Sequence, residues 1–560
     1  MGHENVCWRA IELRFVGDSR EFVVAGPFSR WHLLLDTLKG TAIVVSSASL
    51  RHAFGMQRTI VSLLEQAVHR YGERAFFGVG DRACTFSSFV LAVKGTACAL
   101  RQRGLEAGDR VAVLLPRGER EAVFLLATMV AGGIAVPIHS KLKDDQVRHV
   151  LEDARPRLLV TNAERTVGLR DPGSLFAGQQ VLEASIEPAG IPFAEWPECV
   201  SSDSAVLLYT SGSTGRAKGI EQTHGNLLRG AERVANFLSL DTSDHILALL
   251  SFSFDYGLNQ LLTALLVGCR LSAADYLGVG ELADLLEKHR PTGLAGVPSL
   301  WHEVAAGMAS GALEPKCGAS LRYITNSGGS LLPVDSDVIR RCWPRVSVYA
   351  MYGLTEAFRS AFLPPQEFDA HPDSFGYALE GVELLLASPE DGSILHGPAI
   401  GELVHAGELI AKGYWGRCAD QALRFRKDPR NGRDGIVVYT GDLVRRDDCG
   451  RHYFLSRLDR MIKVQGHRIS PDEVAQAVIG MDSIGEVCVI GIDGGADGQR
   501  IVMWLAGDPR DKAMVDSVRR RCRAKLPSYM LPSDVRVLTE LPHNANGKID
   551  EEALRRMLDT

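Results

Sequence analysis

A segment rich in glycine and hydroxyl side chains follows an apolar stretch near residue 205, and its composition suits it to binding an anion. Residues 205–208 predict a buried strand, and residues 209–219 follow it directly. Glycines there let the backbone adopt positive φ, so that consecutive N–H groups can surround an anion. The spacing is not that of a Walker loop, and a flexible polar loop is the alternative interpretation. The candidate anion-binding residues are Thr210, Ser211, Gly212, Ser213, Thr214, Gly215 and Lys218.

This segment resembles the signature loop of the adenylate-forming (AMP-binding) superfamily, which includes acyl-CoA synthetases, stand-alone and modular adenylation domains, and luciferases. Four further motifs of that family follow in the expected order. Residues 352–356 are similar to the second of the five. The resemblance implies that Tyr352 stacks on adenine, that Thr355 contacts the α-phosphate, and that Glu356 holds Mg²⁺.

The other three motifs lie toward the C-terminus. Residues 439–442 resemble the ribose-binding motif, residues 457–469 resemble an interdomain hinge with the stretch after it, and residues 544–550 resemble the catalytic-lysine motif. The roles that the resemblance implies are ribose binding for Asp442, ATP binding for Arg457, the hinge for Asp459, positions facing the thiol for Gly466 and Arg468, and catalysis for Lys548. The resemblance covers residues 56–560.

The residue types suit this chemistry. A carboxylate is a poor nucleophile toward a triphosphate because both groups are anionic, so the site must neutralise charge that develops on the α-phosphate. Lys548 could approach on a separable domain and leave again. Glu356 is a hard oxygen ligand for Mg²⁺, and Asp442 could accept from two vicinal hydroxyls. Read alone, residues 439–442 and 547–548 are ordinary turns, and only the joint order of the motifs favours the functional interpretation.

The family also implies two half-reactions in one site, between which the C-terminal domain rotates. For Asp459 the alternative is a surface ion pair with Arg457 or Arg460, which would contribute little. The implied cofactors are ATP and Mg²⁺, with CoA or phosphopantetheine as the acyl acceptor. No thiolation domain follows residue 550, so we expect a separate acceptor, CoA or a carrier protein.

An acidic residue stands where the family places its acyl pocket. Phe254 and Asp255 resemble the Phe-Asp pair of amino-acid-activating members, in which the aspartate binds the substrate ammonium. A buried carboxylate needs a partner, and a substrate amine would supply one. The alternative is that Asp255 caps a helix beginning near Leu258.

Arg359 is a second departure from the family pattern. It could pair bidentately with a second carboxylate on the substrate, pair with Asp255, or point away. The pattern most resembles exosortase A-associated AMP-forming acyl-CoA ligases and stand-alone amino-acid adenylation enzymes, a resemblance that does not fix the acid. The other candidate pocket residues, matched by motif, are Asn259, Ala295, Thr325, Ser327, Met351 and Ser360.

We therefore expect an ATP-dependent enzyme that activates an amino acid or another amine-bearing acid and passes it to a thiol. One alternative is an acyl-CoA ligase for a short or medium aliphatic or aryl acid. Another, from a different class, is a catalytically silent nucleotide-binding protein, although Lys548, Glu356 and Asp442 argue against it.

Alternating strand and helix patterns predict an α/β fold with mostly parallel sheets. Strand-like segments at residues 110–115 and 134–138 flank a helical pattern at 119–130. The predicted domains are a large N-terminal domain at 56–458, with a small β-barrel-like subdomain at about 375–458, and a smaller mobile α+β domain at 459–560. Residues 1–55 fit none of these and are either an appended extension or a wrongly assigned start.

Composition excludes several classes. The formal net charge of −6 argues against a nucleic-acid binder. Eleven cysteines without a CxxC pair are typical of reduced thiols, which predicts a cytoplasmic protein. No secretory signal is present, and the longest uncharged run, residues 122–138, is too short for a membrane span, so no membrane anchor is expected.

Overall fold

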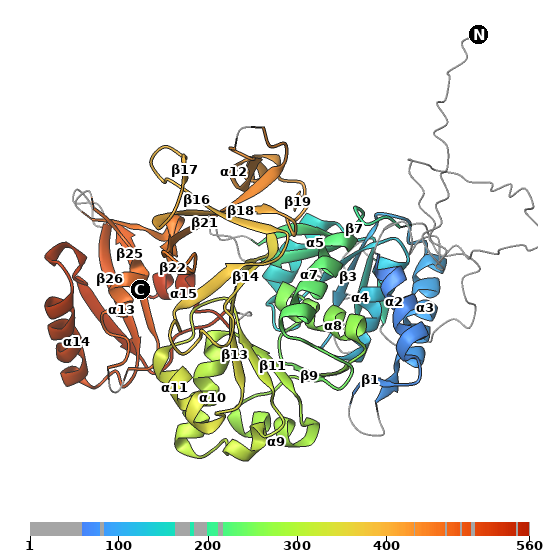
Figure 1. Ribbon diagram of the computed structural model, residues 1–560, viewed down its shortest axis with the longest axis horizontal. Helices are drawn as coiled ribbons and strands as arrows, with labels where there is room; N and C mark the ends of the chain where they lie inside the picture. Colours follow the sequence, from blue (N-terminus) through green and yellow to red (C-terminus); the bar gives the residue numbers. More distant parts are fainter. Residues whose placement is uncertain are drawn as a thin grey trace, which may run out of the picture. The chain divides into compact units, whose positions relative to one another are not determined.

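The structure is a computed structural model (Figure 1), and it describes residues 59–78, 83–162, 180–183, 199–210, 217–430, 432–464, 467–481, 484–493, 499–544 and 547–558. The predicted N-terminal extension, residues 1–55, lies outside these ranges. Residues 59–560 form one compact unit. Within that unit, the domain boundary near residue 459 stays a prediction.

The first sheet has a parallel centre and an antiparallel edge. Its order is β19-β8-β7-β4-β3-β5-β6, with β7 to β6 parallel and β8 and β19 antiparallel to their neighbours. The central strands are buried on both faces, as parallel strands covered by helices usually are. The strands are β3 (Arg110–Leu114), β4 (Ile134–Pro137), β5 (Leu158–Thr161), β6 (Gln180–Glu183), β7 (Ser204–Thr210), β8 (Lys218–Thr223) and β19 (Gly413–Tyr414).

Four of the described helices precede β5 in the sequence. Helix α2 begins at a capping box in which Thr59 and Ser62 bind each other's backbone N–H groups. The predicted helix at 119–130 is confirmed as α4. The helices are α2 (Ile60–Tyr71), α3 (Phe86–Gln102), α4 (Glu119–Val130) and α5 (Asp144–Ala154).

A second sheet runs in parallel from β1 to β13. Its order is β1-β10-β9-β11-β12-β13, and β2 adds an antiparallel edge to β1. The strands are β1 (Ala75–Phe77), β2 (Cys84–Thr85), β9 (His245–Ala248), β10 (Arg270–Ala273), β11 (Gly293–Gly296), β12 (Tyr323–Asn326) and β13 (Ser347–Leu354). The helical segments are α7 (His224–Phe237), α8 (Asp255–Val267), α9 (Val279–His289), α10 (Pro298–Ser310), η2 (Pro315–Gly318) and α11 (Pro333–Cys342).

The second sheet continues from β13 into antiparallel strands, where the small β subdomain is predicted. The order beyond β13 is β14-β15-β22-β21-β18-β16-β17, and β20 also pairs with β21. These elements are β14 (Ala357–Phe362), β15 (Ser374–Ala378), β16 (Val382–Ala387), β17 (Ile394–Leu395), β18 (Ala399–Gly407), α12 (Cys418–Arg424), β20 (Phe425–Lys427), β21 (Ile436–Arg446) and β22 (His452–Arg457).

The C-terminal region has an α+β pattern and its own apolar core. A hairpin of β23 and β24 precedes a three-stranded sheet in which β25 and β26 are antiparallel and β26 and β27 are parallel. The elements are η3 (Leu458–Arg460), β23 (Ile462–Val464), β24 (His467–Ile469), α13 (Pro471–Gln476), β25 (Val487–Asp493), β26 (Gln499–Ala506), α14 (Lys512–Lys525), η5 (Ser528–Met530), β27 (Asp534–Leu538) and α15 (Glu551–Arg556).

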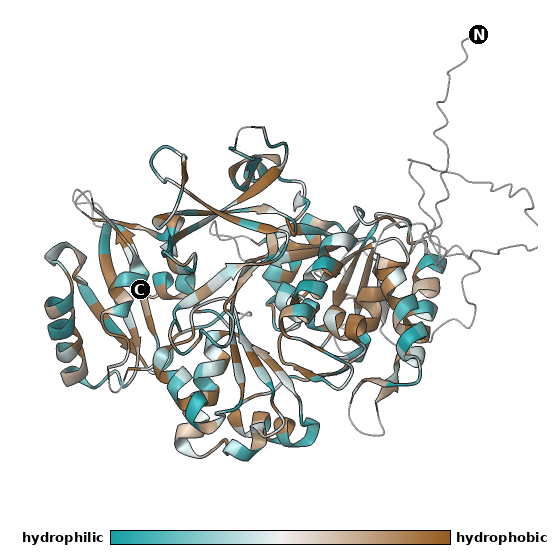
Figure 2. Cartoon of the chain, in the orientation of Figure 1, coloured by the Kyte–Doolittle hydropathy of each residue, from teal (hydrophilic) through white to brown (hydrophobic). Residues whose placement is uncertain are grey.

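The apolar residues gather on the sheets. Figure 2 shows brown, apolar strands at the centre of the parallel sheets, whereas α14 carries much hydrophilic surface. The fold is therefore α/β with a smaller α+β region, as the sequence predicts. No helix in the described part of the chain combines the length and apolar character that crossing a membrane requires.

Candidate active site

Two of the phosphate-loop candidates, Thr210 and Lys218, lie on paired strands. Strands β7 and β8 pair antiparallel with Thr210 opposite Lys218, so the loop leaves and re-enters the sheet at adjacent points. Lys218 Nζ lies 3.0 Å from a carboxylate oxygen of Asp420 and 5.7 Å from the ring centre of Tyr414. Five predicted loop residues lie outside the described ranges, namely Ser211, Gly212, Ser213, Thr214 and Gly215.

Tyr414 holds the carboxylate of Glu356, and the sequence analysis did not identify this tyrosine. Its hydroxyl donates to Glu356 Oε1 at 2.6 Å. Burial, and then the adjacent carboxylate, raise the pKa of Tyr414, so the hydroxyl stays a donor. Thr355 is buried beside it, and the Thr355 carbonyl accepts from Gln222 Nε2 at 2.6 Å. Lys218, Tyr414 and Glu356 thus form a continuous group on β8, β19 and the turn after β13.

Glu356 can be tested as the predicted Mg²⁺ ligand. Among the described residues, no three His, Cys, Asp or Glu side chains are grouped as a metal cage. A single carboxylate nevertheless fits Mg²⁺, because that ion keeps several waters and binds substrate phosphates in place of a full protein shell. Glu356 is therefore the residue that would hold the ion, which would supply charge neutralisation at the phosphates.

Tyr352, Asp442 and Arg457 meet although they lie on three strands. The Tyr352 hydroxyl donates to Asp442 Oδ2, and Arg457 Nη1 lies 3.2 Å from Asp442 Oδ1. Asp442 and Arg457 are register partners in β21 and β22. The Tyr352 ring stacks on Phe375 with centroids 4.5 Å apart. We group them with Lys218, Tyr414 and Glu356 under the name nucleotide side, after the ATP-binding role that the sequence predicts for most of these residues.

Burial is the main electrostatic influence on the nucleotide side. It raises the pKa of Tyr352 well above the usual value, and the nearby Asp442 carboxylate raises it further. The hydroxyl therefore remains protonated and available to Asp442. In this arrangement the Asp442 carboxylate already has partners, which ribose hydroxyls would have to share or replace.

Lys548 reaches the site on a short turn. Asn544 closes this turn, since its side-chain oxygen accepts from the Lys548 N–H at 3.1 Å and its carbonyl accepts from the Gly547 N–H at 3.0 Å. The Lys548 side chain lies beside Gly328, where an added Cβ would be 3.8 Å from Nζ. Lys548 is exposed as a residue, whereas its ammonium is enclosed by protein atoms. Loss of solvation lowers its pKa, while Asp255 acts in the opposite direction.

Asp255 and Arg359 form a buried ion pair. Both residues are 4% exposed, and Arg359 Nη1 donates to Asp255 Oδ2 at 3.3 Å. Asp255 Oδ1 accepts from the Tyr256 N–H at 2.7 Å. Burial raises the pKa of Asp255, and the charge of Arg359 opposes that change. Of the alternatives left open for Arg359, the structure realises the pair with Asp255.

The helix after this aspartate starts earlier than the sequence predicts. Helix α8 begins at Asp255 rather than near Leu258. The carboxylate therefore binds a backbone N–H of the first turn as well as Arg359. Asp255 is thus an acidic residue of the first turn, but Phe254 is the N-cap and no side chain caps this end of the helix. Recognition of a substrate amine by Asp255 stays a prediction.

Other predicted pocket residues surround this pair. Tyr256, which the sequence analysis did not select, packs with Ala295 and Met351 in one apolar cluster, and its hydroxyl bonds to the Thr325 hydroxyl. Ser327 is buried, and its N–H donates to the Gly296 carbonyl at 3.3 Å. The acyl side is defined here by residues of α8 and strands β11 to β14, namely Asp255, Tyr256, Ala295, Thr325, Met351 and Arg359.

Two other predicted pocket residues, Asn259 and Ser360, make side-chain hydrogen bonds to residues outside that group. Asn259 lies one helical turn after Asp255 and accepts from the Thr263 hydroxyl at 3.3 Å. Ser360 is the residue after Arg359 on β14, so its side chain leaves the opposite face of the strand. There its hydroxyl bonds to His405 Nδ1 at 2.9 Å. The Ser360 hydroxyl therefore faces away from Arg359, and its place in a substrate pocket stays a prediction.

The hinge and thiol-facing candidates are only partly described. Asp459 lies in η3, and Arg468 pairs with Lys463 in the hairpin of β23 and β24, but their side chains lie outside the described part. Gly466 lies outside it entirely. Next to Asp459, Arg460 forms an ion pair with Glu551 at the start of α15.

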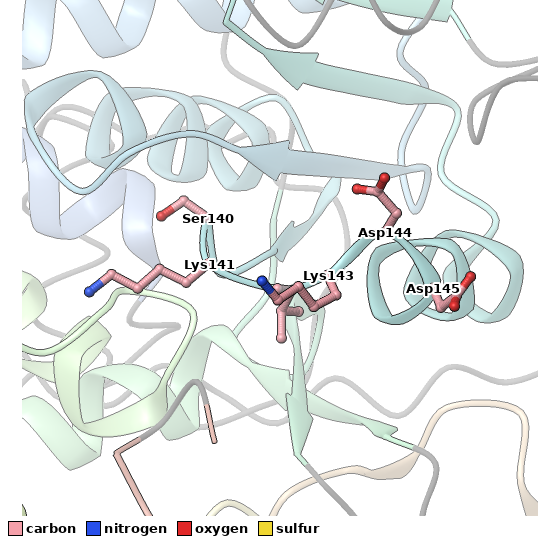
Figure 3. Close-up of a pocket in the computed structure, with 6 residues that line it drawn as sticks. Ser140, Lys141, Lys143, Asp144 and Asp145 are labelled. Atoms are coloured by element: carbon pink, nitrogen blue, oxygen red, sulfur yellow. The ribbon is translucent and has the colours of Figure 1, made fainter. Parts of the chain in front are cut away.

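A separate hollow opens between β4 and α5 (Figure 3). Its volume is about 630 Å³, and it contains none of the predicted site residues. Figure 3 shows Lys141 extending on one side and Asp145 on the first turn of α5. The lining residues are Ser140, Lys141, Leu142, Lys143, Asp144 and Asp145.

Two family models match the chain. Residues 64–415 match the family model of AMP-binding enzymes, and residues 473–548 match that of the AMP-binding enzyme C-terminal domain. An L-proline--[L-prolyl-carrier protein] ligase of Streptomyces coelicolor is 29% identical over 89% of this chain and 96% of its own length. Surfactin synthase subunit 2 of Bacillus subtilis is 27% identical over 89% of this chain, which spans only 14% of that larger relative.

Solved structures share the fold. The ATP-bound MatB of Rhodopseudomonas palustris superposes with a TM-score of 0.78 at 23% identity, covering 90% of this chain and 99% of that one. The anthranilate CoA ligase AuaEII in complex with anthranoyl-AMP gives a TM-score of 0.79 at 23% identity, covering 90% and 97%. At this level of identity the likeness concerns the fold alone.

Proposed function

The chain belongs to the family of AMP-binding enzymes, and from this premise we propose that it joins a carboxylic acid to AMP and then passes the acyl group to a thiol. The observation that supports this most strongly is the position of Lys548. Its ammonium is influenced by Asp255 on the acyl side and by Asp442 on the nucleotide side. A cation that interacts with carboxylates of both sides suits a reaction that joins an acid to a nucleotide.

In the first half-reaction, a carboxylate oxygen of the acid forms a bond to the α-phosphorus of ATP. The bond from that phosphorus to the bridging oxygen breaks, and pyrophosphate leaves. Lys548 stabilises the negative charge that develops on the α-phosphate oxygens. Asp255 and Asp442 favour its charged form and so oppose the loss of solvation.

The nucleotide side would hold the rest of ATP. Asp442 would accept the ribose hydroxyls, and Tyr352 would present its ring to adenine while Thr355 contacts the α-phosphate. Glu356 would hold Mg²⁺, and the loop between β7 and β8 would bind the outer phosphates with Lys218. The existing contacts among these residues support the proposal, because they hold the side chains in place before the ligand arrives.

In the second half-reaction, a thiolate attacks the acyl carbon, and AMP leaves. The acceptor would be CoA or the phosphopantetheine of a separate carrier protein. We propose that the region after Asp459 moves between the two steps, so that Gly466 and Arg468 replace Lys548 near the adenylate. The short turn of Lys548 and the hairpin of β23 and β24 belong to that same region.

The acid we propose first is an amino acid or another amine-bearing acid, because Asp255 could receive its ammonium group. A plain short or medium acid is the second candidate, and one observation favours it. Arg359 already balances the charge of Asp255, so the aspartate does not require an amine as its partner.

Exchange of radiolabelled pyrophosphate into ATP tests the first half-reaction. Purified protein with Mg²⁺ and a panel of amino, aliphatic and aryl acids should catalyse exchange that depends on the acid. Acid-dependent AMP release with CoA, and separately with a phosphopantetheinylated carrier protein, tests the second. If no acid in a broad panel supports exchange while ATP still binds, the chain is a catalytically silent nucleotide-binding protein and the proposal fails.

A further inference from the structure

The guanidinium of Arg359 has one occupied edge and one unoccupied edge. Its Nη1 donates to Asp255 Oδ2 at 3.3 Å and to the Phe358 carbonyl at 2.8 Å. Nε and Nη2 are buried and have no hydrogen-bond partner among the described residues. An unpaired buried donor is unfavourable, more so on a charged group, so a folded protein rarely keeps two on one side chain without use.

The two unpaired nitrogens lie on the same edge of the group. In arginine, the Nε–H and one terminal N–H point in parallel and form a fork that matches the two oxygens of a carboxylate. A single carbonyl oxygen can accept from both, but it carries no negative charge to complement the cation. The charge and the fork together therefore favour a carboxylate, whose two oxygens match the two donors.

Apart from that edge, protein groups already contact the guanidinium of Arg359. The guanidinium carbon lies 5.1 Å from the ring centre of Tyr256 and 5.2 Å from that of Phe358, so aromatic rings are close to the cation. Asp255 is engaged through Nη1 and through the Tyr256 N–H. Tyr256 also belongs to the apolar cluster with Ala295 and Met351, which forms a wall of the acyl side.

We propose that the acid which this enzyme activates carries a second carboxylate, bound by Nε and Nη2 of Arg359. This inference rests on the proposed function, since it names the substrate class of the same site. One carboxylate reacts with ATP near Lys548, and the other is held at the acyl side. Asp255 keeps Arg359 in position through Nη1, so it is a positioning residue for this contact.

The competing explanation is that Arg359 only balances the charge of Asp255. A counter-ion needs no fork, so lysine would serve in that role. A residue that binds a carboxylate through two hydrogen bonds needs the fork, because an ammonium is a compact charge that cannot make the paired contact. The two explanations therefore predict different substrate preferences and different behaviour of Arg359→Lys.

The first experiment uses the unaltered enzyme and four matched acids, namely butyrate, 2-aminobutyrate, succinate and aspartate, with homologues one and two carbons longer. These sets vary the amine and the second carboxylate independently. In pyrophosphate exchange, kcat/KM should be about 10–100-fold higher with the second carboxylate than without it, as expected for charge-assisted hydrogen bonds. Equal or lower values at every chain length overturn the inference while leaving the proposed function intact, whereas no exchange with any acid contradicts the proposed function itself.

The second experiment compares variants of the arginine. Arg359→Gln and Arg359→Lys should both reduce the preference for the second carboxylate to within about threefold, mainly through a higher KM for the acid. Arg340→Lys is the matched control, because Arg340 lies on α11 and pairs with Asp369, neither of which is a predicted site residue. A full preference in Arg359→Lys would show that only the charge matters. If the variants do not fold, the acid panel on the unaltered enzyme still decides the question.

Discussion

The two sides of the site differ in how their polar groups are satisfied. On the nucleotide side, Tyr352 binds Asp442, and Tyr414 binds Glu356, so ligand-binding groups hold each other. On the acyl side, Arg359 keeps two buried donors without partners among the described residues. The nucleotide side is thus organised by contacts that a ligand can exchange one by one. The acyl side depends on a single buried ion pair, which makes it more sensitive to substitution.

The largest effect is expected from breaking that ion pair. Asp255→Ala should lower the free energy of unfolding by about 3–5 kcal/mol, because it leaves Arg359 buried without a counter-ion. Asp255→Ala combined with Arg359→Leu should lose less than the sum of the two single variants. Urea unfolding gives all three values. The exposed pair of Arg536 and Asp534 is the control, and Asp534→Ala should cost less than about 1 kcal/mol.

Loss of under 1 kcal/mol in Asp255→Ala would contradict the difference drawn between the two sides. It would mean that solvent reaches the guanidinium and that the acyl side is no more constrained than the nucleotide side.

The next largest effect concerns the lysine that interacts with carboxylates of both sides. Lys548→Ala should slow adenylate formation about 100- to 1,000-fold, the range found when one charge-stabilising group is removed from a transition state. Single-turnover formation of the acyl-adenylate measures it. Lys525→Ala, at the exposed end of α14, should leave the rate unchanged. A normal rate in Lys548→Ala would place the catalytic cation elsewhere.

A buried histidine borders each side of the site, and protonation of these two histidines should change the stability of the fold to different extents. Burial lowers the pKa of His405 behind β14 to about 4, and it lowers the pKa of His452, which stacks on Phe375. A neutral buried histidine stabilises the fold above its unfolded pKa near 6.5 and loses that contribution as the pH falls toward the folded value. His405 should therefore add a slope of up to about 1.4 kcal/mol per pH unit between pH 6.5 and 4.

Urea unfolding at several pH values between 7 and 4 measures this slope. His405→Gln should flatten it more than His452→Gln does, and the exposed His396→Gln should not change it. An unchanged slope in His405→Gln would show that protonation of His405 does not affect the free energy of unfolding.

The smallest effect is expected from one contact on the nucleotide side. Tyr352→Phe keeps the ring on Phe375 and removes the hydrogen bond to Asp442, so the KM for ATP should rise about 2- to 10-fold. Steady-state exchange at saturating acid measures it. Tyr276→Phe removes a similar bond, to Glu303, outside the site and is the control. A rise above 100-fold would mean that the nucleotide side is no more tolerant than the acyl side.

Local patterns predicted most of the elements. The strand and helix at 110–115 and 119–130 are confirmed as β3 and α4, because short apolar runs and helical spacing are properties of adjacent residues. The motifs likewise marked Lys548 and Asp442, which interact electrostatically in the structure. The roles assigned to Lys548, Asp442 and Glu356 rest on the resemblance and stay predictions.

Contacts between distant strands could not be predicted in that way. Asp255 and Arg359 are 104 residues apart, and their pairing depends on β14 returning beside β13. The same register sends Ser360 to His405, a displacement that a motif match cannot show because neighbouring strand residues face opposite ways. Tyr414 lies on a two-residue strand, which is too short to give any period.

The turn that carries Lys548 approaches the start of α10 at a residue without a side chain. Gly547 has φ of +73°, and a Cβ added there would lie 3.1 Å from Ser299 Oγ at the start of that helix. Since residue 547 inserts no side chain, it adds little apolar surface to this contact, and little hydrophobic free energy opposes separating residue 547 from the helix. If the region after Asp459 moves as proposed, the turn would give up no packed side chain at position 547.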